Sequence, residues 1–104
     1  MNAHSLDAII HAPGRLQICA LLASSSEAEF ATLREAIGVS DSVMSKHLKL
    51  LEEAGYIVAR KAAYNGRQRT WISLTPAGRK AFVAHVAELN RLASSSLAAG
   101  SREN

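Results

Sequence analysis

Two hydroxyl and two ammonium groups are spaced so that a helix would bring them to one face. They recur at i, i+3, i+4 and i+7 and are Ser42, Ser45, Lys46 and Lys49. Hydroxyls donate to or accept from base edges and phosphate oxygens, and lysine supplies a positive point charge. Apolar residues follow the same kind of spacing on another face: Met44, Leu48 and Leu51. The stretch predicts a helix that buries one side and offers the other to the DNA major groove.

A second group of side chains that can bind a polyanion lies in the segment 57–74: Arg60, Lys61, Asn65, Arg67, Gln68 and Arg69. Two extended runs flank Asn65-Gly66, a strong hairpin signal because both residues accept positive φ. A two-residue turn there predicts these cross-strand pairs: Tyr64 with Arg67, Arg60 with Trp71, Ala59 with Ile72, and Ile57 with Leu74. Arginine at the tip of such a hairpin can enter a narrow minor groove. Charge that protects an edge hairpin from aggregation is the alternative, and both can hold.

Local signals indicate how these groups are positioned. A helix over 40–54 follows a shorter helix over 33–37, with Gly38 placed for a left-handed C-cap and Ser40 for an N-cap. The helix N-terminus that Ser40 opens can also face a phosphate. His47 adjoins the apolar stripe, and we expect it to pack against the hairpin or to contact a phosphate. Two helices joined in this way form a helix-turn-helix, whose second helix enters the major groove.

Helices are also predicted at both ends of the chain. Pro13 interrupts or restarts an N-terminal helix, 16–23 is apolar on nearly all sides, and a very short strand fits near Phe30. Apolar residues of the end helices are assigned to a dimer interface: Leu6, Ile9, Ile10, Phe82, His85, Val86, Leu89 and Leu92. The predicted fold class is mainly α with a small β-hairpin, in the order α-α-β-α-α-β-β-α. One domain is predicted over 1–99, followed by a disordered tail over 100–104.

Composition and charge favour an anionic partner. The net charge of the 104 residues is +3, and residues 46–80 hold eight basic and two acidic residues against four basic and seven acidic ones elsewhere. The single cysteine, Cys19, excludes an internal disulfide and a zinc cluster of cysteines, and its apolar helix predicts an inert thiol. No catalytic, cofactor or metal motif, signal peptide or membrane span is found. We therefore expect a cytoplasmic protein that is not an enzyme.

Several short motifs, in order, resemble a known family. They span roughly residues 13–82 and are Leu16–Leu22, Ser45-Lys46-His47-Leu48, Leu51, Ala54-Gly55-Tyr56-Ile57 and Leu74-Thr75-Pro76-Ala77-Gly78-Arg79. The chain resembles bacterial winged helix-turn-helix transcriptional regulators of the MarR and ArsR type, especially short, single-domain MarR-like members. The resemblance implies a homodimer on a pseudo-palindromic operator of double-stranded DNA. The cysteine-pair metal motif of many ArsR-type sensors and the longer dimerisation helices of full-length MarR proteins are absent.

The sequence thus predicts a sequence-specific DNA-binding transcriptional regulator. A dimeric repressor is favoured over an activator, because no activation domain is appended. Helix 40–54 would lie in the major groove, and the wing over 57–74 would contact the minor groove or the backbone. Two other functions stay open: a winged-helix module that binds proteins, and a sensor gated by Cys19 oxidation or by a small molecule between the subunits. The cationic helix face counts against the first of these.

Overall fold

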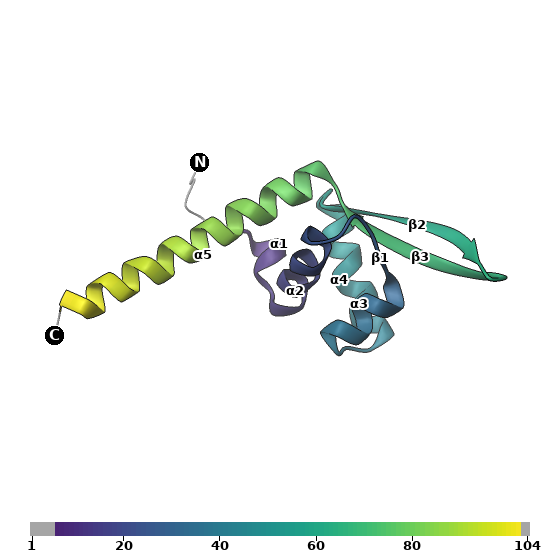
Figure 1. Cartoon of the computed structure of the whole chain (residues 1–104), viewed down its shortest axis with the longest axis horizontal. Helices are drawn as coiled ribbons and strands as arrows, with labels where there is room; N and C mark the ends of the chain where they lie inside the picture. Colours follow the sequence, from purple (N-terminus) through teal and green to yellow (C-terminus); the bar gives the residue numbers. More distant parts are fainter. Residues whose placement is uncertain (1–5, 103–104) are drawn as a thin grey trace.

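The computed structural model describes residues 6–102, with side chains described for residues 6–96. The elements are α1 (Ala8–His11), α2 (Pro13–Ala23), β1 (Ala28–Glu29), α3 (Phe30–Ile37), α4 (Asp41–Glu53), β2 (Ile57–Tyr64), β3 (Arg67–Leu74) and α5 (Pro76–Arg102). This order is the predicted one, and the winged helix fold is confirmed. Figure 1 shows helices α1 to α4 gathered into one body, from which the hairpin β2–β3 and the helix α5 project in opposite directions.

The N-terminal helices are separated where proline predicted a break. Asp7 caps α1, because its carboxylate accepts hydrogen bonds from the backbone N–H groups of Ile9 and Ile10. Pro13 then begins α2, whose Ile18, Cys19 and Leu22 are buried. These side chains lie in a core that also contains Ile10, Leu33, Met44, Leu51, Ile57 and Ile72. Helix α2 is thus the central helix of the body.

A tight turn sets the angle between α3 and α4. Gly38 has φ 78° and ends α3 in the left-handed region, which glycine adopts without a Cβ penalty. Ser40 caps α4, and its hydroxyl accepts a hydrogen bond from the N–H of Val43 at 3.2 Å. Both caps confirm the predicted helix-turn-helix. Met44 and Leu51 of α4 are buried, so the opposite face of this helix is directed away from the core.

The hairpin has the predicted register. Asn65 and Gly66 have φ 51° and 76°, and strand pairing runs from Tyr64 with Arg67 to Ile57 with Leu74. The sheet is three-stranded and antiparallel, in the order β1-β3-β2. Strand β1 immediately precedes Phe30 and pairs its two residues with β3, Ala28 with Ile72 and Glu29 with Trp71. The edge strand therefore brings the segment before α3 to the base of the wing.

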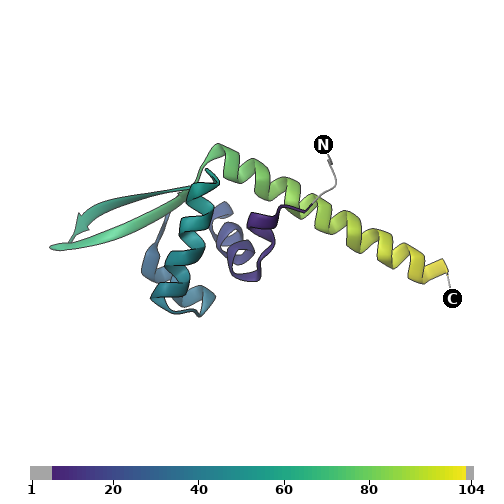
Figure 2. The ribbon, with the colours of Figure 1, turned by 180° about the vertical axis from the view of Figure 1, so that it is seen from behind.

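Helix α5 is the longest element and gives the molecule its elongated shape, 62 × 29 × 22 Å. Thr75 caps it by accepting from the N–H of Gly78 at 2.9 Å. Its C-terminal part extends beyond α1 and α2, as both views of the ribbon show (Figures 1 and 2). None of the described helices is long and apolar enough to cross a membrane.

Helix α5 is assigned as far as Arg102, and residues 103 and 104 lie outside the described residues. The disordered tail over 100–104 stays a prediction.

Two residues assigned to a dimer interface are instead part of the protomer core. Ile10 is 0% exposed and His85 is 2% exposed, so neither has surface to offer a partner. Ile9 and Phe82 also pack against the core, and Leu6, Val86 and Leu89 are half-buried. The reason is that α1 packs against α5 within one chain, where Asp7 and His11 lie beside His85. Of the predicted set, Leu92 is clearly exposed, at 40%.

Candidate nucleic-acid interface

The predicted polar side of α4 faces solvent. We call it the α4 face, and it consists of Ser42, Ser45, Lys46 and Lys49, all exposed. No ion pair to a described acidic residue engages Lys46 or Lys49. The Oγ atoms of Ser40 and Ser42 lie 3.2 Å apart and share a hydrogen bond at the start of the helix. The face thus offers two free ammonium groups and small hydroxyls.

The first turn of α4 also carries an acid, Asp41, whose charge is offset within the protein. The Arg34 guanidinium on α3 donates to the Asp41 carboxylate at 2.9 Å. This contact ties the two helices of the helix-turn-helix together. It also keeps an unpaired negative charge away from the cationic α4 face.

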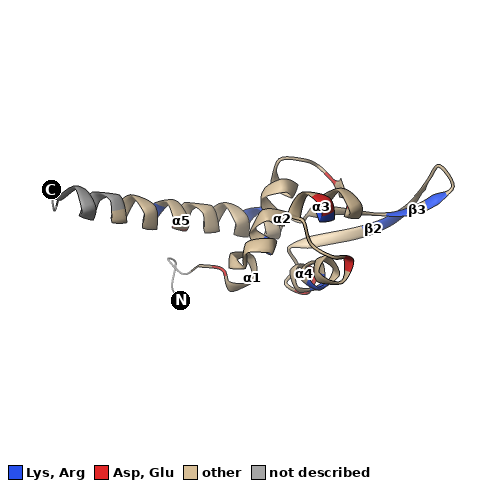
Figure 3. Ribbon diagram, turned by 90° about the horizontal axis from the view of Figure 1, so that it is seen from below, with Lys and Arg blue, Asp and Glu red and all other residues tan. Residues whose placement is uncertain are grey.

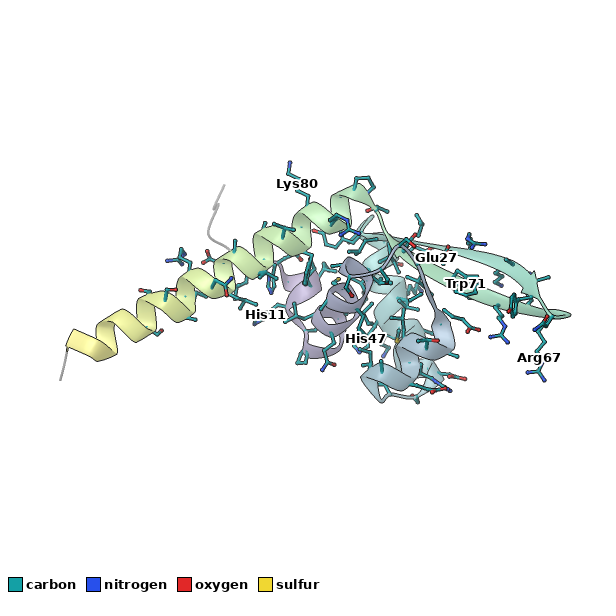
Figure 4. The ribbon with its side chains drawn as sticks, in the orientation of Figure 1. His11, Glu27, His47, Arg67, Trp71 and Lys80 are labelled. Carbon is teal, nitrogen blue, oxygen red and sulfur yellow. The ribbon has the colours of Figure 1, made fainter. Side chains whose placement is uncertain are left out.

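His47 has a packing role. Its ring lies against the start of α2, so closely that a Cβ added at Gly14 would be 2.5 Å from Nε2 (Figure 4). Burial, followed by the charges of Arg15 and Lys46, lowers the pKa of His47 below its ordinary value of 6.5. Arg15 of α2 also lies near the ring, with Nη1 3.4 Å from His47 Nδ1, so these contacts join His47 to α2. A neutral imidazole also supplies no charge to a phosphate near pH 7.

Two of the predicted wing arginines are already engaged at the base of the wing. Arg60 donates to both carboxylate oxygens of Glu27, at 2.6 and 2.7 Å. Its guanidinium also lies over the Trp71 ring, 5.9 Å from the centroid, as predicted from the register. Figure 4 shows Glu27 and Trp71 close together where the hairpin leaves the body. The ion pair lowers the pKa of Glu27 and raises that of Arg60.

Arg69 repeats this arrangement one step further along the hairpin. It donates to the Glu29 carboxylate at 2.9 and 2.8 Å and lies over the Tyr64 ring, 5.3 Å from the centroid. We call these two sets the glutamate–arginine–aromatic stacks. Each glutamate lies at or beside β1, more than 30 residues before its arginine. Local sequence patterns carry no signal for such pairs.

The other four residues of the wing that were predicted to bind DNA are exposed: Lys61, Asn65, Arg67 and Gln68. Neither Lys61 nor Arg67 forms an ion pair with an acid in the described part of the chain. Figure 4 shows Arg67 extending from the tip of the hairpin, on the side where the N-terminal end of α4 lies, whereas Lys80 on α5 points the other way. The unpaired charge of the wing therefore comes from Lys61 and Arg67.

The helix and the wing are neighbours. Helix α4 packs against β2, and the view from below shows basic residues on α4 and along both long strands (Figure 3). Helix α5 leaves the body in the opposite direction to the hairpin. A family model described as a winged helix DNA-binding domain matches residues 15–93.

The chain belongs to this family. It is 37% identical to an uncharacterized protein of Methanocaldococcus jannaschii over 78 residues, which are 75% of this chain and 85% of that protein. The winged helix resembles a transcriptional regulator homologue of Pyrococcus horikoshii OT3, with a TM-score of 0.79 and 22% identity, over 84% of this chain and 86% of that one. It also resembles the transcriptional repressor BigR of Xylella fastidiosa, with a TM-score of 0.63 and 25% identity, over 76% and 74% of the two chains. The protein thus has a winged helix DNA-binding domain, in the fold that these regulators also have.

The winged helix also has an open pocket of about 430 Å³ between the end of α2, β1, α3 and β3. Leu21, Leu33 and Trp71 line its apolar part, and Glu27 and Glu29 are its acids. Both carboxylates are held by the arginines of the stacks, so the pocket presents no free charge. The residues that line the pocket do not indicate a particular class of ligand.

Cys19 is not placed to react. The thiol is 0% exposed, and burial together with the charge of Asp7 raises its pKa to about 11, with Arg15 opposing. A thiol of this kind stays protonated near pH 7 and is shielded from oxidants. The predicted inert role agrees with this environment.

Sequence reasoning missed three residues that bear on the interface. Glu27 and Glu29 set the charge of the wing, and nothing near them in the sequence indicates it. Val43 is exposed on the first turn of α4, although its residue type suggested a buried position. The helical spacing did carry a signal for Val43, because it falls outside the stripe of Met44, Leu48 and Leu51.

Proposed function

We propose that the protein binds DNA in a sequence-specific way, with α4 in the major groove and the hairpin at the minor groove or the backbone. The observation that supports this most directly is that two neighbouring elements carry cationic side chains with no ion-pair partner among the described residues. Lys46 and Lys49 lie on α4, and Lys61 and Arg67 lie on the wing beside it. Phosphate contacts from these four side chains would fix the protein on the duplex, while side chains of the first turns of α4 reach the base edges.

We further propose that the regulator is a homodimeric repressor of a promoter with a pseudo-palindromic operator. The support is the C-terminal part of α5, which extends beyond the body with exposed Leu92. The similar protein BigR is a transcriptional repressor, which favours the same outcome for this chain. Repression would follow from occlusion of the promoter by the bound dimer.

The experiment is a selection of bound fragments from randomised duplex DNA, followed by titration of the enriched operator and of random DNA at several salt concentrations. Lys49→Ala should weaken binding to both DNAs and lower the log–log salt slope by about 0.9, as expected for one lost phosphate contact. Ser45→Ala should change the preferred operator. Lys80→Ala is the matched control, since Lys80 is exposed on α5 and points away from α4 (Figure 4). Equal effects of Lys49→Ala and Lys80→Ala would contradict the assignment of the α4 face.

The same titrations with operator and random DNA also test the two alternative functions, a protein-binding module and a sensor gated by Cys19. A protein-binding module without DNA affinity would fail to bind random duplex even at low salt. A thiol sensor would change its operator affinity on removal of reductant, and Cys19→Ser would abolish that change. The burial and raised pKa of Cys19 argue against this response.

A further inference from the structure

The α4 face contains few groups that distinguish one base pair from another. The hydroxyl of Ser42 already shares a hydrogen bond with Ser40, and a serine hydroxyl can pair with several bases. Lys46 and Lys49 are flexible point charges that suit phosphate as well as base acceptors. A preference for one operator sequence therefore requires a side chain of α4 that interacts favourably with fewer kinds of base.

Val43 is the one large hydrophobic side chain of α4 that is exposed, at 42%. It is not among the residues that pack against the core. Its backbone N–H completes the helix cap with Ser40, which fixes the position of the residue in the first turn of the helix. The side chain itself has no structural role that would require valine there.

The position of Val43 matches the part of a recognition helix that approaches bases. N-terminal residues of such helices contact base edges in the major groove. Val43 precedes Lys46 by three residues, so the two side chains are neighbours along the helix surface. A phosphate or base contact by Lys46 would bring the valine methyl groups to the floor of the groove.

The major groove presents one apolar group, the 5-methyl of thymine. We infer that Val43 is a sequence-reading residue that contacts a thymine methyl group once in each half-site. This inference rests on the proposed DNA binding by α4. Beyond DNA binding, the inference states that the first turn of α4 selects thymine and that an apolar contact with the thymine methyl group makes the selection.

The test uses the selected operator with each thymine replaced in turn by deoxyuridine, which lacks only the methyl group. Wild-type protein should lose affinity about fourfold at one thymine per half-site, as expected for loss of one buried methyl-sized group. In Val43→Ala this loss should disappear. Val83→Ala is the matched control, because Val83 is an exposed valine of α5, at 61%, and should keep the wild-type pattern.

The outcomes separate this inference from the proposed function. Absence of a deoxyuridine penalty in the wild-type protein, or the same penalty in Val43→Ala, would overturn the role of Val43 while leaving DNA binding intact. Failure of the wild-type protein to enrich any operator would overturn the proposed function and the inference with it. The circular dichroism spectrum of Val43→Ala checks folding, and an exposed valine-to-alanine change in a helix favours the helical state.

Discussion

The charge that an arginine of the wing can offer to DNA depends on the acid that reaches it. Arg60 and Arg69 each bind a glutamate and lie over an aromatic ring, whereas Arg67 has neither kind of partner among the described residues. The Arg60 pair is largely solvent-exposed, with 57% of the arginine side chain accessible. Exposed ion pairs are weak, so a DNA phosphate and Glu27 would compete for Arg60.

Removal of the Glu27 charge should therefore strengthen DNA binding. In Glu27→Gln, Arg60 becomes available to a phosphate, and the salt slope on random duplex should steepen by about 0.9. Glu53→Gln is the control, because it removes the same charge from an exposed position at the end of α4. Fluorescence anisotropy titrations over a salt series make the comparison. Equal slopes for the two variants would show that Arg60 stays away from the DNA.

The first helical turn of α5 passes close to the backbone of Tyr56 at Gly78. A Cβ at Gly78 would lie 2.0 Å from the carbonyl oxygen of Tyr56, which also accepts a hydrogen bond from the N–H of Thr75. Gly78→Ala should thus push α5 away from the segment that ends α4, at a cost of about 1–3 kcal/mol or more. Urea denaturation measures this cost. Ala77→Ser, which adds one atom at the neighbouring exposed position, should change stability by less than about 0.5 kcal/mol.

At the scale of elements, short-range rules account for most of what the sequence predicted. The Gly38 and Ser40 caps and the Asn65-Gly66 turn depend on a few neighbouring residues, and the hairpin register follows from the turn. The arrangement of the candidate DNA-binding residues, by contrast, depends on contacts between segments that are distant in the sequence. The docking of β1 on β3 and the packing of His47 on Gly14 are such contacts, and for this reason the paired wing arginines and the histidine role were not predicted.

A chain of hydrogen bonds holds α1 against α5. His85 Nδ1 accepts from the N–H of Asp7 at 3.1 Å, so the neutral ring carries its proton on Nε2, which lies 3.4 Å from His11 Nδ1. The Asp7 carboxylate accepts from the Tyr56 hydroxyl at 2.6 Å and, together with burial, raises the tyrosine pKa to about 12. Protonation of His85 would turn its Nδ1 into a donor and break the contact with Asp7.

Acid should therefore weaken the fold through His85. Burial and the nearby His11 lower the pKa of His85 below 6.5, with Asp7 opposing. The unfolded chain then binds more protons than the folded one, so the stability due to neutral His85 is lost as the pH falls below about 6.5. Urea midpoints at pH 7.5 and 5.5 test this, with His85→Asn as the comparison without a titratable ring. An equal loss in both proteins would assign the acid sensitivity to other groups.

At the scale of the whole molecule, α5 packs against the body of the protomer and also extends beyond it. Phe82 packs against the core and His85 is buried, so their side of α5 faces the body. By helical spacing, Leu89 and the exposed Leu92 continue the same stripe. On a helix Leu92 shares the face of His85 and Leu89, at i+7 and i+3. Val83 lies on the opposite side of α5 and is exposed at 61%. We propose that the exposed part of this stripe, at Leu92, contacts a second copy of the chain.

Leu92→Glu should consequently separate the proposed dimer without unfolding the protomer, because a buried charge at a subunit contact is costly and an exposed one is not. Sedimentation equilibrium should give a dimer for the wild type and for Val83→Glu, and a monomer for Leu92→Glu. The monomer would bind single half-sites, and loss of the second contact should reduce affinity for the full operator about 10²–10⁴-fold. Two half-sites one helical turn apart require α4 helices about 34 Å apart. A Leu92→Glu protein that stays dimeric would place the subunit contact elsewhere, and the predicted half-site spacing would have to be derived from that contact.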